Sequence, residues 1–213
     1  MKTNPPAPAS LTPQTDAVPQ LIAATANTLP EQVNALARAR AFAEPLMAGE
    51  TLDSGENTLA HADAVAAILK GIGGSEAMQA ASYLVHACIH LNKPEEVIAK
   101  AFGANFAALA VETTKLMRVQ QQARAAAPLD DPAVQTENVR KMLLAFSRDL
   151  RVVLLRLASR LQTLRWYAAT KAPCPTLLAR ETQDVFAPLA NRLGIWQIKW
   201  ELEDPMCRPG PRW

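Results

Sequence analysis

The sequence has few aromatic residues, little excess charge and no long apolar run. Aromatic residues make up 5% of the 213 positions, whereas hydrophobic residues as a class make up 49%. Because alanine and leucine dominate that class, helices packed on helices are favoured over a β-sheet. A formal net charge of +2 gives no reason to expect nucleic acid or an anionic membrane as a partner.

Targeting and disulfide signals are also missing. No apolar run approaches the roughly 20 residues of a membrane span, and no charged start precedes an apolar core as in a secretion signal. The three cysteines, Cys88, Cys174 and Cys207, are odd in number and scattered, unlike a disulfide framework or a paired metal-binding motif. We therefore expect a protein of the reducing cytoplasm.

Proline marks the N-terminal segment. Five prolines fall within the first twenty residues, where each fixes φ and removes a backbone donor. Residues 1–25 are therefore predicted to form a disordered tail. The capping pattern at Thr28-Leu29-Pro30-Glu31 predicts the start of helical structure. The first buried stripe is expected to contain Val33, Leu36, Ala37, Ala41 and Glu44.

Periodicity and capping signals predict a series of further helices. Their expected ranges are 59–69, 76–91, 94–98, 102–119, 136–146 and 150–166. Between them, the stretch from Gln120 to Pro132 is rich in glutamine, alanine, aspartate and proline and is predicted to be a mobile surface loop. These ranges contain no internal repeat.

Two of these helices are expected to bury a definite stripe. In the helix over 76–91 the stripe is expected to contain Met78, Ser82, Val85 and Ile89. In the helix over 150–166 the stripe is formed by leucines spaced 3, 4 and 3 residues apart, namely Leu154, Leu157, Leu161 and Leu164.

The stretch Trp196–Leu202 fits two structures by pattern alone. Apolar residues alternate with polar ones as in a strand, but a helical stripe and a Lys199–Glu203 ion pair are equally compatible with it. Large apolar residues at helical spacing are usually core residues. Core positions are therefore expected for Trp196 and Trp200, with docking onto a partner as the alternative.

Two segments resemble a known family. They are Asp149–Leu161 (DLRVVLLRLASRL) and Phe186–Asp204 (FAPLANRLGIWQIKWELED). Both resemble the join between the HD domain and the synthetase domain of the RelA/SpoT family of alarmone enzymes. This resemblance covers residues 54–204, settles the stretch Trp196–Leu202 as helix, and implies an all-α, HD-domain-type helical bundle. It divides the chain into a degenerate HD domain over 26–185 and a linker over 186–213 that leads toward a synthetase domain.

The resemblance also locates the metal site of hydrolysing relatives, which hold a divalent ion, Mn²⁺, with two histidines and two aspartates. Imidazole and carboxylate suit an ion that acidifies a bound water for attack on phosphorus. His61, which follows Ser54-Gly55-Glu56, and His86 match the two histidines. Ala87 and Ser159 stand where the family has its aspartates, and His90-Leu91 stand where it has a catalytic Glu-Asp pair.

These replacements argue against hydrolysis. Alanine and serine cannot supply the negative charge that offsets the desolvation of a divalent ion. Basic residues before the family's Ser-Gly-Glu are replaced by Leu52 and Asp53, and an acidic residue is the wrong sign for a phosphate. We therefore expect no metal and no hydrolysis of the alarmone. Two alternatives stay open, in which His61, His86 and His90 either bind zinc or nickel or are neutral core histidines.

Other features carry weaker signals. The segment Asn138–Ala145 (NVRKMLLA) also resembles the family, and its basic pair, Arg140 and Lys141, either faces a nucleotide or forms a solvated helix face. The arginines after residue 150 have few aromatic partners, so nucleic-acid stacking is not indicated. We find no glycine-rich phosphate loop and no Ser/His/Asp or Cys/His arrangement.

The resemblance implies a parent of the RelA-like subgroup, a GTP pyrophosphokinase that makes the alarmone in the stringent response. In that subgroup a degenerate HD domain has a regulatory or structural role. Prolines and a glycine after Asp204 cannot continue the last helix, which predicts a truncation or frameshift before the Mg²⁺-dependent synthetase domain. The synthetase domain and a ribosome-associated assembly are then partners of a full-length parent only. The alternatives are a free-standing module that binds a guanine nucleotide or a protein, and a three-histidine metallohydrolase.

Overall fold

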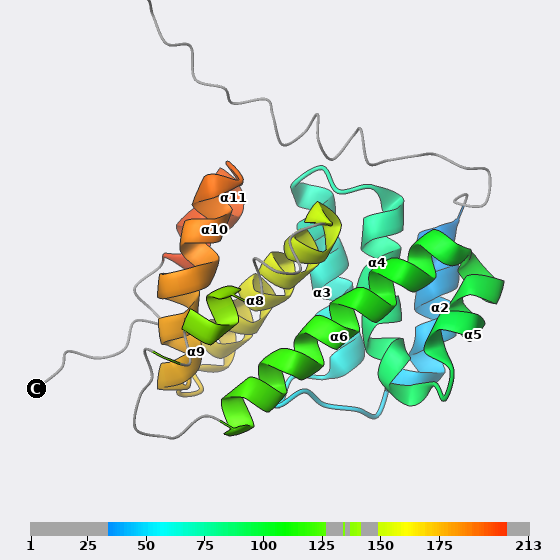
Figure 1. Cartoon of the computed structure of the whole chain (residues 1–213), viewed down its shortest axis with the longest axis horizontal. Coiled ribbons are helices and arrows are strands. Elements are labelled where there is room, and N and C mark those ends of the chain that lie inside the picture. The colour runs from blue at the N-terminus through cyan, green and yellow to red at the C-terminus, as the bar shows by residue number, and fades with distance from the viewer. Residues whose placement is uncertain (1–33, 127–133, 135–136, 142–148, 204–213) are drawn as a thin grey trace, which may run out of the picture.

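The fold is a bundle of helices, and the two longest described helices cover residues 104–126 and 150–170 (Figure 1). A computed structural model describes residues 34–126, 134, 137–141 and 149–203. Within these ranges all regular elements are helices, apart from one isolated β-bridge between Thr51 and Asn57. The all-α class is therefore confirmed. The predicted tail over 1–25 and the start of helix at Thr28–Glu31 lie outside the described residues.

The named elements of the described ranges can be given in the order of the chain. In chain order they are α2 (Ala35–Met47), α3 (Thr58–Gly71), α4 (Glu76–Ala87), the 3-10 turn η2 (Cys88–His90), α5 (Pro94–Phe102), α6 (Ala104–Ala126), α8 (Leu150–Thr170), α9 (Thr176–Glu181), the π-helix η3 (Thr182–Phe186), α10 (Ala187–Arg192) and α11 (Trp196–Leu202). None of the described helices combines the length and apolar composition that a membrane span requires.

Helix α2 buries a different stripe from the expected one. Its buried residues are Ala35, Ala39, Ala43 and Met47, whereas Ala37, Ala41 and Glu44 are exposed and Leu36 is half-buried. The prediction was wrong because alanine occupies both faces of this helix and gives the pattern little contrast. The small side chains of the buried face allow α2 to pack closely on α4.

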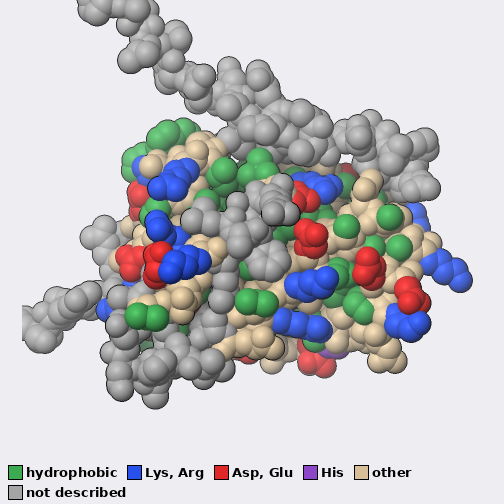
Figure 2. All heavy atoms as spheres, in the orientation of Figure 1, with side chains coloured by type: hydrophobic (Ala, Val, Ile, Leu, Met, Phe, Trp, Pro, Cys, Tyr) green, Lys and Arg blue, Asp and Glu red, His purple; other side chains and the backbone are tan. Residues whose placement is uncertain are grey.

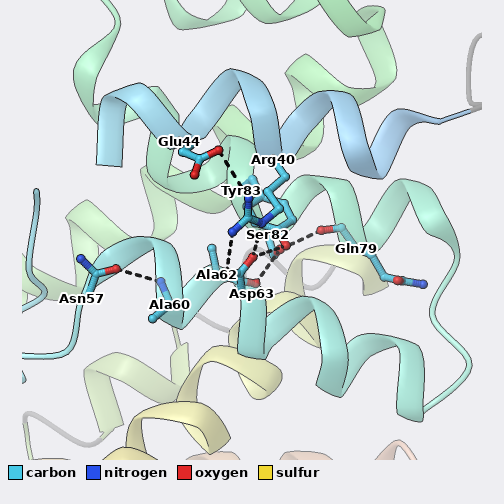
Figure 3. Close-up of polar contacts among 9 residues, drawn as sticks. All are labelled: Arg40, Glu44, Asn57, Ala60, Ala62, Asp63, Gln79, Ser82 and Tyr83. Atoms are coloured by element: carbon cyan, nitrogen blue, oxygen red, sulfur yellow. Dashed lines mark hydrogen bonds and ion pairs between the residues drawn. The ribbon is translucent and has the colours of Figure 1, made fainter. Parts of the chain in front are cut away.

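A polar cluster ties α2, α3 and α4 together (Figure 3). Asp63 on α3 accepts hydrogen bonds from Arg40 Nε at 2.9 Å and from the hydroxyl of Tyr83 at 2.7 Å. Partial burial opposes ionisation of Asp63, but the hydrogen bonds from Arg40 and Tyr83 outweigh it and lower the pKa of the carboxyl. Burial and the hydrogen bond to Asp63 both raise the pKa of Tyr83. The cluster thus fixes the face of α3 that points away from the cleft described below.

Helix α4 lies at the centre of the bundle and is buried on every side from Met78 onward. The expected stripe is correct for Met78, Ser82 and Val85, but Ile89 is 52% exposed. This difference arises because α4 ends at Ala87 rather than at Leu91, and η2 then turns the chain outward.

Helix α6 continues through the stretch that was expected to be a loop. It extends to Ala126, and the side chain of Gln120 is buried and accepts a hydrogen bond from Arg156 Nη2 at 2.9 Å. The loop prediction was therefore wrong for residues 120–126, where glutamine and alanine are good helix formers. The rest of that stretch, residues 127–132, lies outside the described residues.

Helix α8 forms the second central element and contacts α3, α4, α6 and α11. Leu154, Leu157, Leu161 and Leu164 are all buried, so the predicted stripe is confirmed. The helix begins at the cap residue Asp149, whose side chain accepts from the backbone N–H of Arg151 at 2.9 Å. Its position among four partners makes α8 the wall that carries several of the cleft residues.

The short C-terminal helices α9 to α11 lie together beside α8 (Figure 1). The stretch Trp196–Leu202 is helical, as the resemblance implied, and Ile198 and Leu202 are buried. The expected ion pair between Lys199 and Glu203 is present, with an N–O distance of 3.9 Å. The core prediction was wrong for Trp196 and Trp200, which are 45% and 66% exposed. Figure 2 shows hydrophobic side chains at the surface over this part of the molecule.

The C-terminal layer is attached to α8 through a buried ion pair. Arg160 Nη2 donates to Glu181 Oε2 at 2.7 Å, and the exposed fractions of the two side chains are 3% and 0%. The same guanidinium donates to the carbonyl of Leu178 and lies 4.3 Å from the ring centre of Phe186. Such a pair is costly to break, because removal of one partner leaves a buried charge without its counter-charge.

We expect Glu181→Ala to lower the free energy of unfolding by about 3–5 kcal/mol, because it removes the carboxylate from the buried Arg160. The matched control is Glu201→Ala, which breaks the ion pair of Glu201 with Arg165 at 2.6 Å, where the side chains are 44% and 46% exposed. That exposed pair is expected to contribute about 0–1 kcal/mol. Urea unfolding followed by circular dichroism measures both. Equal losses in the two variants would contradict the prediction.

Candidate functional site

A cleft of about 430 Å³ opens between the loop before α3, the turn η2, α6, α8 and the segment that leads into α9. Its volume lies in the range of about 300–1,000 Å³ that is typical of small-molecule sites. Its lining residues include Asp53, His61, His86, Ile89, His90, Met117, Gln120, Arg156, Ser159, Arg160, Thr163, Leu177 and Leu178. Four of the predicted site residues, His61, His86, His90 and Ser159, are therefore brought to one cleft.

The loop before α3 places Glu56 beside His61, which lines the cleft. Gly55 has a φ of 89°, in the region that favours glycine, and a side chain there would also meet the ring of Trp166 at 3.4 Å. The backbone N–H of Leu52 donates to the carbonyl of Glu56 at 2.9 Å. Asn57 then caps α3 by accepting from the N–H of Ala60 at 3.0 Å. The Ser54-Gly55-Glu56 motif is thus a tight turn that ends in a buried carboxylate.

His61 is buried and engaged at both ring nitrogens. Its Nδ1 lies 2.7 Å from Glu56 Oε2, and its Nε2 lies 3.0 Å from Ser159 Oγ. A carboxylate only accepts hydrogen bonds, so Nδ1 donates to Glu56, and in the tautomer with its proton on Nδ1 the Nε2 atom accepts from the serine hydroxyl. The second oxygen of Glu56 accepts from Gln162 Nε2 at 2.6 Å. These contacts join the start of α3 to the middle of α8.

His86 lies beside His61 but in a different environment. The ring centroids are 5.5 Å apart and the rings are nearly perpendicular. Complete burial, followed by the charges of His61, Arg156 and His90, lowers the pKa of His86 to about 3. Its Nδ1 is buried and has no hydrogen-bond partner in the described structure. His86 is therefore neutral at physiological pH.

The other positions of the expected metal constellation are only partly brought together. Ser159 lines the cleft next to His61, whereas Ala87 is fully buried and does not reach the cleft. His90 lines the cleft from η2 and is exposed, while Leu91 is half-buried outside it. In the described ranges, no three or more His, Cys, Asp or Glu side chains form a group that could hold a metal ion. The three-histidine arrangement is thus not assembled there.

The basic pair Arg140 and Lys141 is exposed and does not line the cleft. Arg140 forms an ion pair with Glu137 at 3.0 Å. The cleft instead receives Arg156 from α8, and the amide nitrogen of Gln120 is buried there with no hydrogen-bond partner in the described structure. Sequence reasoning missed Gln120 because that residue was expected in a loop.

Sequence reasoning also missed the order in which the side chains meet. We found no Ser/His/acid arrangement in the sequence, but the structure aligns Ser159, His61 and Glu56 in one hydrogen-bonded series. A signal was present, because the family resemblance already placed His61 and Ser159 in one site and Glu56 in the adjoining motif. To recognise the arrangement, Ser159 must be regarded as a hydrogen-bond donor to His61, and not only as the replacement of a metal-binding aspartate.

Comparisons with known proteins agree with this architecture. A probable guanosine-3′,5′-bis(diphosphate) 3′-pyrophosphohydrolase of Synechocystis sp. is 41% identical over 169 residues, which are 79% of this chain and 21% of that protein. A GTP pyrophosphokinase of Myxococcus xanthus is 36% identical over 167 residues, which are 78% of this chain and 22% of that protein. The bifunctional (p)ppGpp synthase/hydrolase SpoT of Escherichia coli K12 is 35% identical over 179 residues, which are 83% of this chain and 24% of that protein.

The chain spans about a fifth to a quarter of the length of these curated relatives. A family model described as HD domain matches residues 39–196, which include every helix of the cleft. Together with the helical architecture and the positions of His61 and His86, these matches establish the family. The chain belongs to the HD domain family and contains the HD domain of a RelA/SpoT-type protein.

Proposed function

We propose that this HD domain is the regulatory or structural domain of a RelA-like GTP pyrophosphokinase of the cytoplasm and does not itself hydrolyse the alarmone. The observation that carries the proposal is the hydrogen bond between Nε2 of His61 and Oγ of Ser159 at 3.0 Å. It occupies the nitrogen that a metal ion would need. The relatives' names include both hydrolases and a GTP pyrophosphokinase, so the side chains of this chain must decide between the two activities.

The residues present do not fit a divalent ion. Glu56 takes the proton-bearing nitrogen of His61, and the hydroxyl of Ser159 stands against the other, so neither nitrogen of this ring is open to an ion. Ala87 has no donor atom, and a neutral serine hydroxyl does not supply the negative charge that a dehydrated ion requires. His86 alone cannot hold an ion of this type. We therefore assign no cofactor to the cleft and no step that depends on one.

The cleft nevertheless retains the size and part of the charge of a nucleotide site. Arg156 lines it and presents a guanidinium, the group best suited to phosphate oxygens. Asp53 lines the same cleft and lowers the affinity for an anion. We propose that a guanine nucleotide or the alarmone binds here without turnover, and that its binding stabilises the domain.

Calorimetric titration with the alarmone tests this proposal, with released pyrophosphate measured in the same samples in the presence of Mn²⁺. We expect binding without release. Arg156→Gln is expected to weaken binding by on the order of 10-fold, because one charge-assisted hydrogen bond is worth about 1.5–3 kcal/mol. The control Arg140→Gln/Lys141→Gln is expected to leave affinity unchanged, because neither side chain lines the cleft. Release of pyrophosphate by the unmodified protein would refute the assignment.

Restoration of the two carboxylates should create a metal site. We expect Ala87→Asp/Ser159→Asp to be less stable than the unmodified protein without metal, because both new charges crowd a buried region. Added Mn²⁺ should then raise its melting temperature, since a ligand present at 100 times its Kd contributes about 2.7 kcal/mol. Ser159→Asp alone is the control: it restores only one carboxylate, so Mn²⁺ should raise its melting temperature by less. A comparable Mn²⁺ shift in the unmodified protein would show that its own residues already bind the ion.

The low pKa of His86 should be visible in the pH dependence of stability. Its folded pKa of about 3 lies below the ordinary value of 6.5, so the unfolded chain binds the proton more readily between these values. The contribution of His86 to the free energy of unfolding is thus fully present above about pH 6.5. It is lost as the pH falls toward 3, by at most about 1.4 kcal/mol per pH unit for one proton. In His86→Leu the slope of the free energy of unfolding against pH, between pH 6.5 and 4.5, should decrease by up to this amount. Urea unfolding at several pH values measures the slope, and an unchanged slope would show that His86 is not the source of the pH dependence.

A further inference from the structure

Three side chains from two distant parts of the sequence form a hydrogen-bonded series that ends in the cleft. Glu56 accepts from Nδ1 of His61 at 2.7 Å, and Nε2 of His61 lies 3.0 Å from the hydroxyl oxygen of Ser159. With the proton on Nδ1, the free lone pair on Nε2 faces the serine hydroxyl. Carboxylate, imidazole and hydroxyl therefore stand in the order of orienting acid, general base and nucleophile.

The acid end of the series is held from two sides. Glu56 Oε1 accepts from Gln162 Nε2 at 2.6 Å, and the backbone N–H of Glu56 donates to Ser54 Oγ at 3.3 Å. Gln162 lies three residues after Ser159 on α8, so the same helix carries the nucleophile and the group that holds the acid. This arrangement fixes the ring of His61 in one orientation before any substrate arrives.

The hydroxyl end of the series is more exposed than the acid and the base. Glu56 and His61 are only 4% and 1% exposed, whereas Ser159 is half-buried and lines the cleft. The acid and base are thus shielded from water, which strengthens their interaction, and the hydroxyl is the most accessible member of the series. This gradient is what a nucleophilic site requires.

The same cleft contains an unused hydrogen-bond donor. The amide nitrogen Nε2 of Gln120 is buried and has no partner in the described structure, although its oxygen accepts from Arg156 Nη2 at 2.9 Å. Arg156 lies three residues before Ser159 on α8, on the same face of the helix. A buried donor without a partner is uncommon in proteins and is suited to an oxygen that gains negative charge.

We infer that Ser159 is the nucleophile of a metal-free esterase site, with His61 as its general base and Glu56 as the residue that positions His61. Ile89, Met117 and Leu178 give the cleft an apolar wall, so the substrate class is a carboxylic ester with an apolar acyl group. The inference does not rest on the proposed function, because it requires neither a nucleotide nor a metal ion.

The reaction balances without any further reagent. Ser159 Oγ forms a bond to the carbonyl carbon while its proton passes to His61 Nε2, and the carbonyl electrons move to the oxygen near Gln120. The C–O bond to the alcohol then breaks, and the departing oxygen takes the proton from His61 to leave an acyl-serine. Water attacks this ester, again gives a proton to His61, and releases the carboxylic acid as Ser159 recovers its proton.

The test is covalent labelling of the full chain by a fluorophosphonate probe in buffer with EDTA, followed by peptide mass spectrometry. We expect a single adduct on Ser159 and a stoichiometric burst of p-nitrophenol from p-nitrophenyl butyrate. Ser159→Ala should abolish both signals, and His61→Gln should slow labelling by about 10²–10⁴-fold, the usual contribution of a general base. Thr170→Val is the matched control, because Thr170 carries an exposed hydroxyl on the same helix and does not line the cleft.

The position of the adduct in the unmodified protein decides the matter even where a variant fails to fold. No adduct on Ser159, or an adduct that forms equally fast in a folded His61→Gln variant, overturns the inference. Glu56→Gln separates positioning from structure, because it should slow labelling by at least about 10-fold and alter its pH profile while the chain stays folded. Labelling and alarmone titration are separate measurements, so failure of one leaves the other proposal intact.

Discussion

The contact that determines the chemistry of this domain is the hydrogen bond between His61 and Ser159 (3.0 Å), backed by the bond from His61 to Glu56 (2.7 Å). A buried imidazole needs partners for both nitrogens, because an unsatisfied polar group in the interior costs about 1–3 kcal/mol. Ser159 supplies the second partner as a neutral hydroxyl. The start of α3 is therefore joined to the middle of α8 by these side chains, and Gln162 also contacts Glu56.

Two further sets of buried polar side chains in the described structure differ in their role. Arg160 and Glu181 neutralise each other within the core and attach the C-terminal helices to α8, so their role is structural. The unpartnered nitrogens of His86 and Gln120 instead face the same cleft from α4 and α6. Because native interiors leave few polar atoms unsatisfied, this concentration at one cleft indicates a binding site rather than a packing fault.

Sequence alone was sufficient where the pattern had contrast. The leucine stripe of α8 is correct because large apolar residues alternate with arginine and glutamine, so one face is clearly apolar. The stripe of α2 was wrong because alanine occurs on both of its faces, and Gln120 was misplaced because glutamine and alanine occur in both loops and helices. The exposure of Trp196 and Trp200 depends on what covers α11, which periodicity does not reveal. The series of Glu56, His61 and Ser159 joins residues 98 positions apart, a proximity that only the resemblance indicated.

A histidine that binds a metal ion and a histidine that acts as a general base make the same demand on the protein. In both cases a carboxylate or carbonyl must accept from one ring nitrogen, so that the other presents its lone pair in a fixed direction. Glu56 meets that demand here whatever stands opposite Nε2. An aspartate at position 159 places a metal-ligating oxygen there, whereas the serine places a proton that the same lone pair can accept. The side chain at position 159, together with the absence of a carboxylate at Ala87, therefore favours one kind of chemistry over the other, while the loop, the helix and the orienting acid stay the same.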